Sequence, residues 1–68
     1  MKRIKIGYYQ SPKDGQWYWR KMRGNGRVTS DGAEGYSKRS NVIRACRKEA
    51  ETIKADFHVT IEEIQVKP

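Results

Sequence analysis

Apolar and polar residues alternate along the first part of the chain, which is the period of a half-buried β-strand. Residues 3–9 (RIKIGYY) place isoleucine or tyrosine at every second position, and residues 16–23 (QWYWRKMR) repeat the alternation. Residues 11–15 (SPKDG) combine Pro with Asp-Gly and predict a turn between these strands. Asn25-Gly26 then predicts a tight hairpin that returns residues 27–30 antiparallel to the second strand.

A helical period follows the predicted loop of residues 31–35. Apolar residues recur there at spacings of three and four, which predicts a helix over residues 38–55 with one apolar face. Ser37 offers a side-chain oxygen for the N-cap of this helix. The apolar face consists of Val42, Ile43, Cys46, Ala50 and Ile53.

The pattern of residues 57–66 (FHVTIEEIQV) predicts a final strand whose apolar residues switch from one face to the other partway along. Phe57, Val59 and Ile61 share one parity, whereas Ile64 and Val66 share the other. A bulge at Glu62-Glu63 explains this change, and so does a strand that crosses into a second sheet environment, such as a partner subunit.

The order of elements predicts an α+β fold with a three-stranded antiparallel sheet packed on one helix, followed by a C-terminal strand. A chain of 68 residues forms one domain, 1–68, with a small core. One Cys and one His exclude an internal disulfide and a four-ligand zinc site, so oligomerisation is the remaining way to stabilise this core. We therefore expect a homodimer that exchanges the last strand, through Val59, Ile61, Ile64 and Val66.

Charge is distributed unevenly along the chain. Residues 1–30 hold eight basic residues and one acidic residue, so the whole formal net charge of +7 falls in this half. Residues 31–68 balance seven of each sign, with the basic residues concentrated at the start of the helix. A basic surface of this kind attracts polyanions such as nucleic acid, although a solvated surface that keeps a small protein soluble has the same composition.

The residues that could carry catalysis are few. His58 stands alone in a strand, and Cys46 falls on the apolar helix face, where a thiol acts as a small apolar group. Glu62 and Glu63 are adjacent in a strand and point to opposite faces, so they cannot act together on one substrate. We expect a protein that is not an enzyme and that uses no cofactor or metal.

Aromatic and basic residues are interleaved on the first two strands, a mixture that can stack bases and neutralise phosphates. Trp17 and Trp19 are expected to face the helix, because its apolar face must bury against the sheet. The other sheet face, with neighbouring basic residues, is the predicted contact surface for nucleic acid or another partner. The candidate contact residues are Lys5, Tyr9, Tyr18, Arg20, Met22, Arg23, Arg27, Lys38, Arg39 and Arg44.

Residues 15–55 resemble the YegP-like family of small domains of unknown function. The resemblance rests on GQWYWRK, on Asn25-Gly26 with Val28, on Ser30 and the segment 34–36 (EGY), and on a helix that begins with a Val-Ile pair. Lys21 departs from the family pattern, in which an aliphatic residue is usual. The resemblance implies three strands, a helix and a strand, in tandem repeats or in a homodimer with exchanged C-terminal strands. It implies no particular activity.

Two functions remain open from the sequence. The first is a small basic homodimeric module that contacts nucleic acid through the aromatic sheet face. The second is a protein-binding adaptor or inhibitor, of the kind encoded by a phage or another mobile element, that acts on a larger host protein. No apolar run is long enough to span a membrane, and we expect a cytoplasmic protein without membrane contact.

Overall fold

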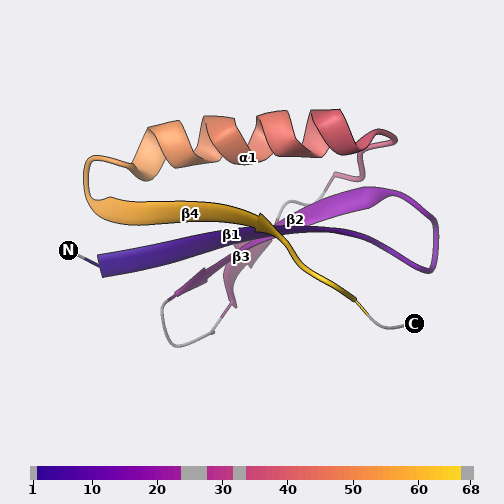
Figure 1. Cartoon of the computed structure of the whole chain (residues 1–68), viewed down its shortest axis with the longest axis horizontal. Helices are drawn as coiled ribbons and strands as arrows, with labels where there is room; N and C mark the ends of the chain where they lie inside the picture. Colours follow the sequence, from indigo (N-terminus) through magenta and orange to yellow (C-terminus); the bar gives the residue numbers. More distant parts are fainter. Residues whose placement is uncertain (1, 24–27, 32–33, 67–68) are drawn as a thin grey trace.

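The computed structural model describes residues 2–23, 28–31 and 34–66, and it places one helix across one face of a four-stranded sheet (Figure 1). The predicted α+β class and the order of three strands, a helix and a strand are confirmed. In chain order the elements are β1 (Lys2–Gln10), β2 (Trp17–Arg23), β3 (Val28–Asp31), α1 (Arg39–Ile53) and β4 (Phe57–Glu63).

The sheet has the strand order β3-β2-β1-β4. β2 pairs antiparallel with both β1 and β3, as predicted for the first three strands, but the sheet as a whole is mixed because it also contains a parallel pair. β4 adds to the edge of this sheet, parallel to β1, with Ile4 opposite Val59 and Ile6 opposite Ile61. Within one chain, the last strand therefore completes the sheet. The predicted hairpin at Asn25-Gly26 lies outside the described residues.

The N-cap residue of helix α1 lies one position later in the chain than predicted. Lys38 is the N-cap residue, with extended backbone angles (φ −123°, ψ 141°) and no side-chain capping bond. Its carbonyl oxygen accepts hydrogen bonds from the backbone N–H groups of Asn41 and Val42, at 3.1 Å and 3.4 Å. The prediction that Ser37 caps the helix is therefore wrong, because Ser37 lies one position before the residue where the helical turn starts.

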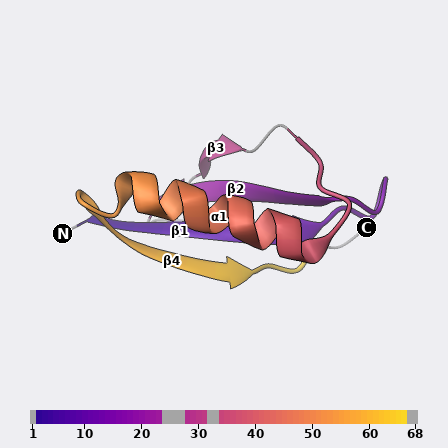
Figure 2. The ribbon, with the colours of Figure 1, turned by 90° about the horizontal axis from the view of Figure 1, so that it is seen from above.

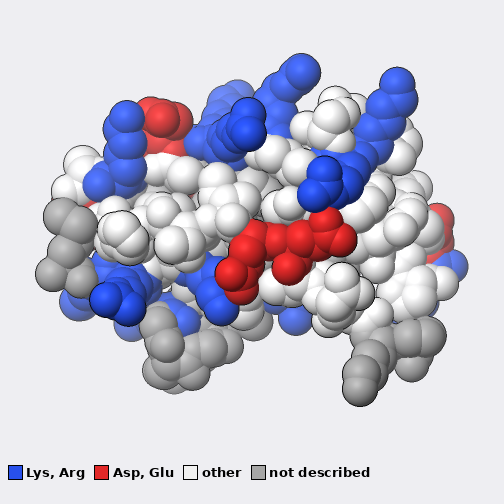
Figure 3. Space-filling model, in the orientation of Figure 1, with Lys and Arg blue, Asp and Glu red and all other residues white. Residues whose placement is uncertain are grey.

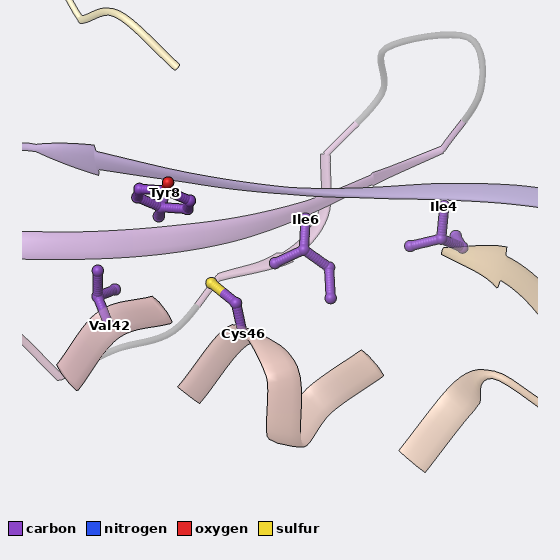
Figure 4. Packing of buried hydrophobic residues seen from close by; sticks show 5 residues of the cluster. All are labelled: Ile4, Ile6, Tyr8, Val42 and Cys46. Atoms are coloured by element: carbon purple, nitrogen blue, oxygen red, sulfur yellow. The ribbon is translucent and has the colours of Figure 1, made fainter. Parts of the chain in front are cut away.

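The core lies between α1 and the sheet, and its buried residues come from β1 and α1 (Figure 4). Val42 and Cys46 lie one turn apart on the helix face that meets the sheet, and both are fully buried. Trp17 and Trp19 pack against this cluster as expected. Among the described residues, the buried hydrophobic side chains of the sheet are Ile4, Ile6 and Tyr8, which confirms the alternation predicted for the first strand.

Lys21 belongs to the same row of β2 as the two tryptophans, on the face toward α1. Its ammonium group lies 2.7 Å from a carboxylate oxygen of Glu49, and the two side chains are only 20% and 26% exposed. The ion pair explains how a lysine is accommodated at a position beneath the helix, since a buried cation needs an anionic partner.

The apolar residues near the end of the chain switch from one face of the sheet to the other, because the backbone stays extended beyond the end of β4. Val59 and Ile61 pack against the core under the helix. The backbone N–H of Ile64 donates a hydrogen bond to the carbonyl oxygen of Tyr8 (2.8 Å), and its side chain covers Gly7 on the other face of the sheet. The predicted bulge at Glu62-Glu63 is therefore not needed, because successive side chains in an extended chain point to opposite faces.

Candidate nucleic-acid interface

The face of the sheet opposite α1, which we call the open face, carries the aromatic and basic residues that the sequence singled out. The register places Lys5 opposite Met22, Gly7 opposite Arg20, and Tyr9 opposite Tyr18. Because alternate residues of paired strands share a face, five of the candidate residues lie together on the open face. These five are Lys5, Tyr9, Tyr18, Arg20 and Met22.

Three of these side chains form a stacked group, the Tyr9–Tyr18–Arg20 ladder. The rings of Tyr9 and Tyr18 are nearly parallel, with centroids 6.0 Å apart and an interplanar angle of 28°. The guanidinium carbon of Arg20 lies 4.6 Å from the Tyr9 centroid, within the range of a cation–π contact. All three side chains are partly exposed, so the ladder is ordered by its own contacts and still reaches solvent.

The turn between β1 and β2 orients one end of this ladder. The Tyr18 hydroxyl donates a 2.5 Å hydrogen bond to Asp14, whose other carboxylate oxygen accepts the backbone N–H of Gln16 at 3.0 Å. These two hydrogen bonds lower the pKa of the Asp14 carboxyl, and the same bond to Asp14 raises the pKa of Tyr18. Gly15 provides the positive φ of 72° that the turn requires. Asp14 is a site residue that the sequence did not indicate beyond its place in a turn.

Arg20 forms no ion pair with an acidic side chain that the structure describes, although it lies opposite Asp31 in the register of β2 and β3. Its Nε atom is buried and has no hydrogen-bond partner. A guanidinium that lies over a tyrosine ring still has N–H groups at its edge, which can donate to a phosphate or to a base edge.

Lys5, by contrast, is already paired. Its ammonium group lies 3.0 Å from a carboxylate oxygen of Glu62, and both side chains are about half exposed. At the same end of the face, Met22 and Ile64 cover Gly7, so that a Cβ at Gly7 would lie 3.0 Å from Ile64 and 3.1 Å from Met22. The open face therefore carries the aromatic rings and Arg20 at one end, and the Lys5–Glu62 ion pair beside the apolar side chains of Met22 and Ile64 at the other.

The remaining candidate residues lie elsewhere. Arg23 is opposite Ile4 in the register and so belongs to the row that faces the helix side, not to the open face. Arg27 lies outside the described residues. Lys38, Arg39 and Arg44 belong to the helix layer, where basic side chains project over α1 (Figure 3).

Arg39 connects the start of α1 to the sheet. Its Nε donates to Glu63 at 3.0 Å, and one of its terminal nitrogens donates to the Tyr8 hydroxyl at 3.1 Å. Arg44, Arg47 and Lys48 are exposed on the outer side of the helix, at the spacing of neighbours on one face. The helical spacing of the sequence also predicts that Arg47 and Lys48 share a face with Arg44, opposite the apolar face of the helix. The outer face of α1 is thus a second basic surface, on the opposite side of the molecule from the ladder.

The described residues offer little for catalysis or metal binding. They contain no group of three or more His, Cys, Asp or Glu side chains placed to hold a metal ion. Cys46 is fully buried, and burial raises the pKa of its thiol to about 11. His58 is exposed on β4. Across the described part of the chain, no helix is long and apolar enough to cross a bilayer.

Comparison with known proteins gives no relative: no family model, no curated protein and no solved structure matches this chain. The resemblance to YegP-like domains therefore stays a prediction, and the function has to be argued from the surface.

Proposed function

We propose that this protein is a small, non-catalytic nucleic-acid-binding module that takes single strands on its open face. The observation that carries the proposal is the Tyr9–Tyr18–Arg20 ladder. Bases stack on exposed aromatic rings regardless of sequence, and an arginine beside the rings neutralises the backbone. The ladder combines both groups on one partly exposed surface.

The arrangement favours single strands over duplex. The open face offers ring surface and one cation without an acidic partner among the described side chains, whereas a duplex is held by many phosphate contacts. Lys5 contributes less to nucleic-acid binding than its charge suggests, because its ammonium group already forms an ion pair with Glu62. Unstacked bases of a single strand can reach the rings, but paired bases cannot.

The proposed module is a cytoplasmic homodimer. Exchange of residues 57–66 is one way to form this dimer: an exchanged strand would lie beside β1 of the partner, in the position that β4 occupies here. Exchange is not required to complete the sheet, since β4 completes the sheet of its own chain.

Fluorescence anisotropy with labelled single-stranded and duplex oligonucleotides tests the function. Tyr18→Ala should weaken single-strand binding by about 1–3 kcal/mol, the usual value of one stacked base. Tyr18→Phe loses the hydrogen bond to Asp14 but keeps the ring, so it should retain most of the affinity. Arg20→Ala should reduce the salt dependence by about one single-strand phosphate contact, a change of about 0.7 in the log–log slope.

Arg47→Ala is the matched control, because it removes one positive charge from the outer face of α1. Equal losses for Arg20→Ala and Arg47→Ala would mean that net charge alone drives binding. Absence of binding to either oligonucleotide at physiological salt would refute the proposal. The protein-binding adaptor or inhibitor would then replace it, with Tyr18, Arg20 and Met22 as the first residues to substitute, since tyrosine and arginine also dominate protein interfaces.

A further inference from the structure

The outer edge of β4 is open to pairing with another strand. β4 is the last strand of the sheet, and α1 covers the face of the sheet and not this edge (Figure 2). Edge strands are usually protected by proline, by charged side chains, above all lysine, or by a bulge. Residues 57–63 contain no proline and no lysine, their two charged residues, Glu62 and Glu63, lie at the end of the strand, and their register with β1 is continuous.

The backbone groups that face outward can be assigned. The N–H of Ile64 donates to Tyr8 on β1. In a parallel ladder alternate residues direct both N–H and C=O to the same neighbour, so the even-numbered residues of β4 bond to β1. The odd-numbered residues Phe57, Val59, Ile61 and Glu63 therefore present their N–H and C=O groups at the open edge.

We infer that this edge binds a second copy of the chain, β4 against β4, antiparallel about a two-fold axis at Thr60. In this register Val59 of one copy forms a hydrogen-bonded pair with Ile61 of the second copy, and Phe57 with Glu63. Thr60 lies opposite Thr60 in a pair that is not hydrogen-bonded, where side chains approach most closely. Every outward backbone group of the strand then has a partner.

The side chains select this register. His58 falls opposite Glu62 of the second copy on the open face, which places an imidazole N–H donor beside a carboxylate. The partly exposed Val59 and Ile61 meet on the other face. Sliding one strand by two residues in one direction places Glu62 opposite Asp56, and in the other direction it places His58 opposite Ile64. Both alternatives lose the complementary pair.

This dimer keeps β4 in the sheet of its own chain and does not depend on nucleic-acid binding. It differs from strand exchange, because the two chains meet edge to edge and their sheets become continuous. Thr60 of one copy lies opposite Thr60 of the second copy only in the edge-to-edge arrangement.

Cross-linking through Thr60→Cys tests the inference. Opposed residues in a pair without hydrogen bonds are about 4.5 Å apart at Cα, within the range that a disulfide spans. Mild oxidation should convert this variant to a covalent dimer, seen on a non-reducing gel. His58→Cys is the matched control: it is exposed on the same strand and the same face, but it meets Glu62, so it should remain uncross-linked. The native Cys46 is buried and should not contribute.

Thr60→Lys provides the second variant, because it opposes two ammonium groups at the axis. Sedimentation should show a monomer for this variant and a dimer for the wild type, while circular dichroism remains unchanged, since Thr60 is exposed. A wild-type monomer at micromolar concentration would overturn the inference. Equal cross-linking of His58→Cys and Thr60→Cys would also overturn it, and so would a dimer in which Thr60→Cys does not cross-link, the result expected of strand exchange.

Discussion

Two ion pairs with the same separation allow the effect of burial on pair strength to be measured within one small domain. Lys21 and Glu49 are 2.7 Å apart with side chains 20% and 26% exposed. Lys54 and Glu51 are also 2.7 Å apart, but their side chains are 65% and 69% exposed. We expect a coupling energy of about 0.3–0.5 kcal/mol for the exposed helical pair. For Lys21 and Glu49 we expect about 1–2 kcal/mol, less than the roughly 3–5 kcal/mol lost when a fully buried pair is broken.

Double-mutant cycles followed by urea unfolding give both energies. The first cycle uses Lys21→Met, Glu49→Gln and the double variant, and the second uses the same substitutions at Lys54 and Glu51. Lys21→Met is suited to the site because methionine fills the same space beneath the helix. In the first cycle, Glu49→Gln alone should cost more than Lys21→Met, since it keeps the partly buried cation and removes the carboxylate charge beside it. Equal coupling energies in the two cycles would refute the reasoning.

Three further predictions concern the core, the covered glycine and the turn. The buried Cys46, with a thiol pKa of about 11, should react with a thiol reagent slowly in the native protein and rapidly in urea, and equal rates would contradict its burial. Gly7→Val should lower the free energy of unfolding by about 1–3 kcal/mol through overpacking. Ile64→Ala should recover part of that loss in a urea titration, and no recovery would contradict the contact over Gly7. The lowered pKa of Asp14 means that its carboxylate stabilises the fold above its ordinary pKa of 3.8 and that this contribution is lost as the pH falls through the lower folded-state value. The stability difference between wild type and Asp14→Asn should therefore shrink in acid, and parallel pH profiles would contradict the hydrogen bond from Tyr18.

The sequence predicted what depends on local periodicity. Alternation placed Ile4 and Ile6 toward the helix and Tyr9 and Tyr18 away from it, because strand residues change face at every step. Helical spacing identified the buried face of α1, including Cys46, in the same way.

Contacts between distant segments could not be predicted from periodicity. β4 lies beside β1 because two strands near opposite ends of the chain pair with each other. The contact of Ile64 with Gly7 follows from that pairing. Lys21 pairs with Glu49, which is 28 residues away, and no local pattern indicates this contact. At the candidate site, periodicity predicted that Tyr9, Tyr18 and Arg20 lie on the same face of the sheet. It did not predict that their side chains stack, or that Lys5 forms an ion pair.

Chemical-shift mapping by NMR tests the central claim most directly. A single-stranded oligonucleotide added to isotope-labelled protein should move the signals of Tyr9, Tyr18 and Arg20 most, with small changes along α1. The largest changes at Arg44, Arg47 and Lys48, or no change at saturating oligonucleotide, would contradict binding on the open face.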